Sequence, residues 1–74
     1  MNEKDRPVWI VGKLVKRTRR AVKIFALDKQ DNTRTAIIPC QYVLEELKAP
    51  GAEEWFYKVP AWQAFQNKLV WREV

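Results

Sequence analysis

Three segments in the first half of the chain predict β-strands, and in the first of them apolar and polar residues alternate toward its end. The segments are residues 8–16, 21–27 and 33–38, and all three are rich in β-branched or aromatic residues. Residues 28–32 form a cluster of turn-forming residues of the kind that closes hairpins. The spacing therefore predicts a meander of three antiparallel strands.

The first of these strands has two unusual features. Both of its alternating sets of side chains begin apolar, which predicts that the start of the strand is covered on both faces. Gly12 then interrupts the pattern. A glycine inside a strand commonly marks a bulge or a sharp bend in a strongly curved sheet.

The second half of the chain predicts one further strand and a helix. Residues 55–59 predict the strand, and the proline that follows fits the first position of a short helix over residues 61–69. Trp62, Phe65 and Leu69 fall at positions i, i+3 and i+7, which gives this helix an aromatic and apolar side. That side is expected to cap an open end of the sheet.

Two segments leave alternatives open. Residues 39–48 fit either a short helix that begins at the proline or a single 3₁₀ turn that leads into an irregular loop. Residues 70–74 fit either a short terminal strand or loosely packed chain. Residues 49–54 are a loop by composition.

Together these elements predict a β-rich α+β fold. It is expected to be a small curved antiparallel sheet, or an SH3-like partial barrel, of about four strands with one short C-terminal helix. A flexible N-terminus, residues 1–7, is expected to precede a single small domain, residues 8–74.

A chain of 74 residues is close to the size at which a fold is marginal without help. A lone cysteine excludes an internal disulfide, and without histidine a structural zinc site would need carboxylates beside one thiolate. Nine aromatic residues are therefore expected to pack the core densely, and homodimerisation is the other expected source of stability.

The charge of the chain is concentrated in one place. Residues 13–23 contain six basic residues among eleven and no acidic residue. The basic residues are Lys13, Lys16, Arg17, Arg19, Arg20 and Lys23. Because the segment connects two predicted strands, it is expected to form a hairpin with dense positive charge at its tip, where phosphates can bind. The alternative is that these cations protect strand edges against aggregation.

The residue types exclude the common catalytic sites. The chain has no histidine and no serine, so neither a Ser-His nor a Cys-His dyad can form. Cys40 is expected to be buried and inert. The acidic pairs Glu45/Glu46 and Glu53/Glu54 are interpreted as solvated surface charge rather than as a hydrolase or metal site. We expect no enzymatic activity, no metal and no cofactor.

The same features suggest a compartment. No apolar run approaches the roughly 20 residues that a membrane helix needs, and residues 1–7 lack the apolar core of a signal peptide. With a single thiol and no disulfide, the protein is expected to be cytoplasmic and not bound to a membrane.

Aromatic residues flank the basic hairpin, and this combination is typical of nucleic-acid recognition. Phosphates of DNA or RNA are expected to contact Arg17, Arg19 and Arg20. The approach is expected to be lined by Lys13, Lys16 and Lys23. Phe25 or an exposed tryptophan is expected to stack on a base. Contacts made mainly to phosphate predict weak sequence selectivity.

Two segments resemble a pattern in small phage and mobile-element proteins that have no established activity. Residues 36–43 form a strand ending in an Ile-Pro step and a short polar turn, and residues 55–64 run through Val-Pro-Ala-Trp-Gln-Ala into a helix. The resemblance covers residues 21–69. The chain departs from the pattern at residues 40–42, where a small polar pair is commoner, and at Asn67-Lys68, where a glycine is usual.

The resemblance implies a compact sheet with a terminal helix and a phage-like origin, and it carries no functional residues with it. It raises a second hypothesis, in which the protein is an inhibitor or adaptor that binds an acidic surface of a host protein, including proteins of defence systems. In a third, the chain is a structural subunit that oligomerises through an exposed strand edge.

Overall fold

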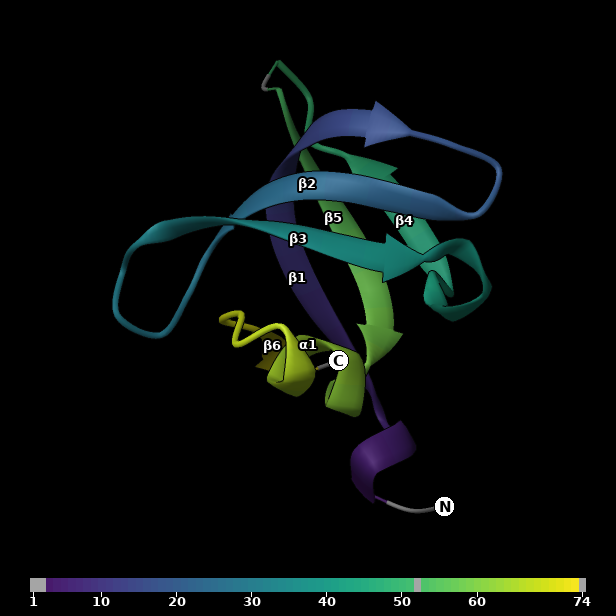
Figure 1. The fold of residues 1–74 in the computed structure, drawn as a ribbon, viewed down its shortest axis with the longest axis vertical. Coiled ribbons are helices and arrows are strands. Elements are labelled where there is room, and N and C mark those ends of the chain that lie inside the picture. Colours follow the sequence, from purple (N-terminus) through teal and green to yellow (C-terminus); the bar gives the residue numbers. More distant parts are fainter. Residues whose placement is uncertain (1–2, 52, 74) are drawn as a thin grey trace.

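The computed structural model describes residues 3–51 and 53–73 and has one antiparallel sheet as its main feature (Figure 1). The strands are β1 (Pro7–Arg17), β2 (Ala21–Leu27), β3 (Thr33–Pro39), β4 (Glu45–Lys48), β5 (Glu54–Pro60) and β6 (Arg72–Glu73). They pair in the order β3-β2-β1-β5-β4, and β6 pairs with β1. The helices are α1 (Ala61–Gln66) and two 3₁₀ turns, η1 (Glu3–Asp5) and η2 (Cys40–Tyr42).

The predicted meander and the predicted strand before the helix are confirmed. The ends of β1, β2, β3 and β5 agree with the predicted bounds to within one residue. The predicted count of about four strands is too low, because β4 and β6 also join the sheet. For residues 39–48, the 3₁₀ alternative is the one that forms, at η2, but a strand follows it instead of an irregular loop.

Strand β1 is long and strongly bent because its neighbours change along its length (Figure 1). Residues 7–13 pair with β5, and residues 12–17 pair with β2 along the other edge. Gly12 lies where the two pairings overlap. A Cβ atom there would stand 2.7 Å from the carbonyl oxygen of Phe25, so the close approach of β1 to β2 requires glycine. The register of β1 against β2 shifts between Leu14 and Lys16, where Val15 is the extra residue of a bulge.

One face of the start of β1 is more open than predicted. Val8 and Ile10 are buried in the core, whereas Val11 is exposed and Trp9 is half-buried. The expectation of cover on both faces was therefore wrong, because β5 and β2 flank β1 in the plane of the sheet and no described element is layered over Val11.

The core is aliphatic rather than aromatic. Its buried residues are Val8, Ile10, Val22, Ile24, Ala26, Ala36, Ile38, Tyr57, Val59, Ala61, Ala64 and Leu69. Tyr57 is the one aromatic residue in this set, while all four tryptophans are half-buried. Tyr42, Trp55 and Trp71 are half-buried and pack against this core. The expected aromatic packing is therefore found mainly at the margin of the core, and β-branched residues and alanine fill its centre.

Helix α1 faces the core with a different side from the one predicted. Ala61, Gln63 and Ala64 are buried, whereas Phe65 is 68% exposed. Trp62 is half-buried and lies edge-on to Tyr42, with ring centroids 4.8 Å apart. The helix ends at Gln66, so Leu69 reaches the core from the segment after the helix rather than from its face.

The N-terminal segment packs against this helix. The amide of Ala61 donates a hydrogen bond to the carbonyl oxygen of Arg6, at 2.8 Å. The Arg6 guanidinium pairs with the Glu73 carboxylate, at 3.0 Å, and this hydrogen bonding raises the pKa of Arg6 and lowers that of Glu73. Of the N-terminus predicted to be flexible, residues 3–5 form η1 and Pro7 begins β1, while residues 1 and 2 lie outside the described part. Within residues 3–51 and 53–73, no helix is long and apolar enough to cross a membrane.

Burial of the Tyr57 hydroxyl leads to a first prediction. The oxygen has no hydrogen-bond partner among the described residues, and burial raises the pKa of Tyr57. The folded protein therefore holds this proton more tightly than the unfolded chain does. This contribution to stability is complete below about pH 10, the unfolded pKa, and is lost as the pH rises further. We expect Tyr57→Phe to be as stable as the wild type or up to about 1 kcal/mol more stable at neutral pH.

We also expect the variant to lose less stability than the wild type between about pH 9 and about pH 11. Urea unfolding at the two pH values measures both effects. A variant that is less stable at neutral pH, or equally sensitive to alkali, would contradict this account of Tyr57.

Candidate nucleic-acid interface

The β1–β2 turn is held in a defined shape by hydrogen bonds around Thr18. The Thr18 amide donates to the carbonyl oxygen of Ala21, at 2.9 Å, and the Thr18 hydroxyl accepts from the amides of Arg20 and Ala21, at 3.3 and 3.1 Å. The amide of Cys40 donates to the carbonyl oxygen of Arg20, at 2.7 Å. With their backbone braced in this way, Arg19 and Arg20 project from a supported turn.

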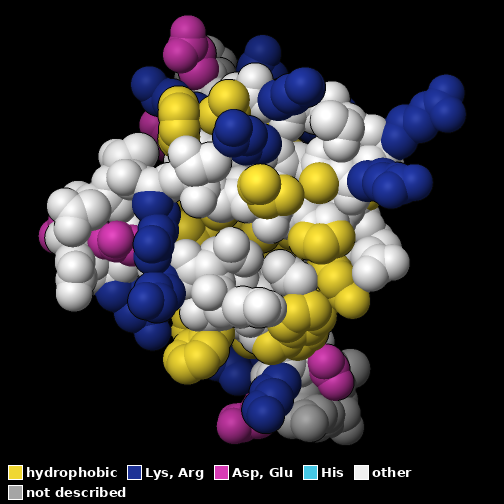
Figure 2. All heavy atoms as spheres, viewed as in Figure 1, with side chains coloured by type: hydrophobic (Ala, Val, Ile, Leu, Met, Phe, Trp, Pro, Cys, Tyr) yellow, Lys and Arg dark blue, Asp and Glu magenta, His cyan; other side chains and the backbone are white. Residues whose placement is uncertain are grey.

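Two lysines at the base of this turn lie directly opposite each other. Lys16 of β1 and Lys23 of β2 are paired in the sheet register, and both side chains are exposed. Like charges in this position destabilise a sheet. Among the described residues, neither lysine takes part in an ion pair, and the same holds for Arg19 and Arg20. Figure 2 shows Lys and Arg side chains projecting where Figure 1 places this turn, with the visible acidic side chains elsewhere.

Arg17 differs from the other predicted phosphate contacts. Its guanidinium donates two hydrogen bonds to the Glu46 carboxylate of β4, at 2.7 and 2.8 Å, and lies 5.5 Å from the centre of the Trp55 ring. Hydrogen bonding to Glu46 raises the pKa of Arg17. The charge of Arg17 is thus matched within the fold, and the pair connects the end of β1 to β4.

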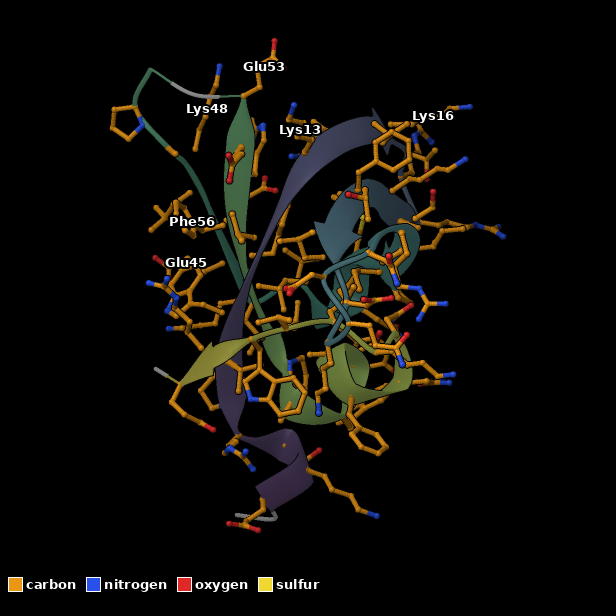
Figure 3. All side chains as sticks on the ribbon, turned by 90° about the vertical axis from the view of Figure 1, so that its left-hand side faces the viewer. Lys13, Lys16, Glu45, Lys48, Glu53 and Phe56 are labelled. Carbon is orange, nitrogen blue, oxygen red and sulfur yellow. The ribbon has the colours of Figure 1, made fainter. Side chains whose placement is uncertain are left out.

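Lys13 and Phe25 extend the site along the outer face of the sheet. They pair directly across β1 and β2, and the Phe25 side chain is 43% exposed. Lys13 also pairs in register with Glu54 of β5, although the two do not form an ion pair. Figure 3 shows Lys13 and Lys16 from the side of the molecule on which Lys48 and Phe56 are also visible.

The structure therefore divides the seven residues predicted for the site. It brings six of them together on one hairpin: Lys13, Lys16, Arg19, Arg20, Lys23 and Phe25. None of the five cations among them forms an ion pair with a described carboxylate. The seventh, Arg17, forms an ion pair with Glu46 instead. Nothing local in the sequence indicates this pair, because Glu46 lies 29 positions from Arg17.

The tryptophans are engaged elsewhere in the fold. Cations lie over three of them: Lys58 over Trp9, Arg17 over Trp55 and Lys29 over Trp71, at 4.7–5.5 Å from the ring centres. The fourth, Trp62, packs edge-on against Tyr42. Of Phe25 and the tryptophans, Phe25 is thus the exposed one, paired with Lys13 in the register, and the half-buried Trp55 borders the same hollow as these two residues.

The thiol and the carboxylates form no metal site in the part that the structure describes. Cys40 is half-buried, not fully buried as expected, and its sulfur lies 3.6 Å from the Thr18 carbonyl oxygen. Within residues 3–51 and 53–73, no group of three Cys, Asp or Glu side chains could hold a metal ion. Glu45 and Glu46 instead pair with Lys58 and Arg17.

Comparisons with known proteins identify no relative of this chain. No family model, curated protein or solved structure matches the chain.

Proposed function

We propose that this protein is a non-enzymatic nucleic-acid-binding module whose β1–β2 hairpin contacts the phosphates of DNA or RNA. The observation that carries the proposal is the unmatched charge of Lys16, Arg19, Arg20 and Lys23. Three other cations, Arg6, Arg17 and Lys58, pair with carboxylates, whereas exposed cations outside the hairpin such as Lys48, Lys68 and Arg72 have no ion pair among the described residues either. What distinguishes these four is therefore their density on one hairpin. Phosphates that approach the hairpin would relieve the repulsion between Lys16 and Lys23 and meet two arginines on a braced turn.

The bent sheet supports this proposal as a scaffold. Strand β1 pairs with both β2 and β5, and η2 leads the chain from β3 to β4 at the opposite edge. We propose an SH3-like partial barrel as the finer description of this arrangement. In such a scaffold the hairpin projects beyond the closed part of the sheet, where a long polymer can reach it.

Binding of this kind has a characteristic dependence on salt. If four phosphates of a single strand are neutralised, log K falls against log salt with a slope of about −2.8. Affinity should then fall roughly 50-fold between about 50 and about 200 mM salt. Little difference is expected between oligonucleotides of different sequence but equal length, because phosphates carry no base information.

Fluorescence anisotropy with labelled DNA and RNA oligonucleotides over this salt range tests the proposal. Steep salt dependence with weak sequence preference is the expected result. An absence of binding at the lowest salt would contradict the proposal and direct attention to an acidic surface of a partner protein as the ligand of the same cations.

A further inference from the structure

The outer face of the sheet carries exposed apolar side chains from all five strands of the main pairing order. They are Val11, Phe25, Leu27, Ile37, Leu47 and Phe56, and each is more than a third exposed. Figure 2 shows hydrophobic side chains interspersed with Lys and Arg over β2 and β3, and Figure 3 shows Phe56 on the β4–β5 side. No described helix covers these residues.

The sheet register arranges these side chains in rows. Phe25 lies between its two register partners, Lys13 on β1 and Thr35 on β3. One row further from the hairpin tip, Val11 pairs with Phe56, and Phe56 pairs with Leu47. Toward the tip, Lys23 pairs with both Lys16 and Ile37. Cations and apolar side chains thus share the two rows nearest the tip, the second of which also holds Glu54, and the third row is apolar.

Phe25 and Lys13 border two hollows. One, of about 340 Å³, lies on the outer face and is also lined by Val11, Leu27 and Glu54. The other, of about 530 Å³, reaches from Phe25 and Lys13 to Glu53, Lys48 and Trp55, the last two of which the register places on the opposite face of the sheet. Both hollows are within the size range of ligand sites, and both contain Lys13 and Phe25 in their walls.

We propose that this outer face binds single-stranded nucleic acid, with bases stacked on Phe25 and seated in the hollows beside it. The inference rests on the proposed binding of phosphates at the hairpin. It adds that the nucleic acid is single-stranded and that it runs along the outer face of the sheet. Phosphates lie along Arg19, Arg20, Lys16 and Lys23, while Lys13 lies beside Phe25 and the bases face the apolar rows.

Charge complementarity selects this ligand over others. Lys13, Lys16 and Lys23 lie in these rows, with Glu54 beside Lys13, so the ligand that fits them best combines negative charge with flat apolar surfaces. A single strand offers both, because its bases can turn out and stack on aromatic rings. The bases of a duplex are stacked on one another, so a duplex would use the cations and leave Phe25 unused.

Replacement of Phe25 by leucine tests the inference, because leucine keeps apolar bulk and removes the ring face. The matched control is Phe65→Leu, the same change at an exposed phenylalanine on α1. Anisotropy titrations of the wild type and both variants use a labelled oligothymidine and a mixed-sequence duplex of equal length over a range of salt.

We expect Phe25→Leu to weaken binding of the single strand by roughly 5- to 150-fold, the range for the loss of one stacked base. The salt slope should remain unchanged, because no phosphate contact is lost, and duplex binding should remain unchanged too. Phe65→Leu should bind as the wild type does.

Three results would overturn the inference. Equal wild-type affinity for single strand and duplex, or an unchanged Kd for Phe25→Leu, would leave phosphate binding at the hairpin in place and remove the stacking face. Self-association in sedimentation velocity that Phe25→Leu abolishes would assign the face to a second copy. An absence of all binding would overturn the proposed function as well, so the two failures are distinguishable.

Discussion

Replacing Lys16, Arg19, Arg20 and Lys23 together with glutamine should weaken nucleic-acid binding by about 100-fold or more at roughly 50 mM salt. The four side chains are exposed and have no ion pair among the described residues, so their removal leaves no buried carboxylate unpaired. The salt slope of about −2.8 expected for four contacts should fall toward zero. Removal of the opposed Lys16–Lys23 pair should also leave stability unchanged or slightly higher. Anisotropy and thermal melting measure the two effects.

Arg17 provides the matched control within the same hairpin. Because Glu46 already matches its charge, Arg17→Gln should change the Kd by less than about threefold and leave the salt slope nearly unchanged. Glu46→Gln frees the guanidinium and should strengthen binding. Equal losses of affinity from Arg17→Gln and from a single change at Arg19 would show that net charge alone, rather than the unmatched cations, determines binding.

Gly12→Ala should cause the largest loss of stability among single substitutions that add one methyl group. The added Cβ would lie 2.7 Å from the Phe25 carbonyl oxygen, 3.1 Å from Cδ1 of Ile24 and 3.4 Å from Cβ of Ala26. The first of these is a backbone atom of β2, and β1 is also held by β5 at this residue, so neither strand can move aside cheaply. We expect a loss of about 3 kcal/mol, at the upper end for overpacking. This would lower the melting temperature by roughly 12–24 °C in a domain of this size.

Gly51→Ala is the control for this effect. Gly51 has a φ of 72°, and nothing lies within 4 Å of an added Cβ, so alanine there meets only the intrinsic cost of a left-handed conformation, about 1–2 kcal/mol. Thermal and urea unfolding of both variants separate the two causes. A Gly12→Ala protein as stable as Gly51→Ala would show that β1 and β2 can separate at this point.

Composition and turn signals predicted four strands well because each is a run of β-branched, aromatic or other apolar residues bounded by turn residues or proline. The period of two appears in the structure, where Val22, Ile24 and Ala26 of β2 are buried and the residues between them are exposed. Strand β4 was missed because it carries little of this signal. Its sequence, Glu45-Glu46-Leu47-Lys48, buries no side chain fully, and its place depends on backbone pairing with β5 and on ion pairs to Lys58 and Arg17.

The face of α1 was predicted wrongly for a related reason. Helical periodicity assumed that the helix continues to Leu69, but the chain leaves the helix at Asn67, and Lys68 takes a left-handed φ of 58°. The bridge between Asp28 and Leu69 then holds Leu69 in the core. The alanines of the helix, Ala61 and Ala64, are its buried apolar residues. The prediction chose the wrong side because Trp62 and Phe65 are larger and more hydrophobic than alanine.

For the candidate site, the density of positive charge on the hairpin was predictable from the sequence, but the neutralisation of Arg17 by Glu46 was not. Local sequence shows where cations gather, whereas the placement of Lys16 opposite Lys23 depends on the bulge at Val15. The loss of Arg17 from the set depends on Glu46, a residue of the strand that the pattern did not predict.

The most direct test is an NMR titration of the ¹⁵N-labelled protein with a short single-stranded oligonucleotide. The account predicts that the largest amide shift changes fall at residues 16–23 and at Lys13 and Phe25, with residues 61–73 nearly unchanged. Shift changes that concentrate on residues 61–73 and leave the hairpin unaffected would contradict it.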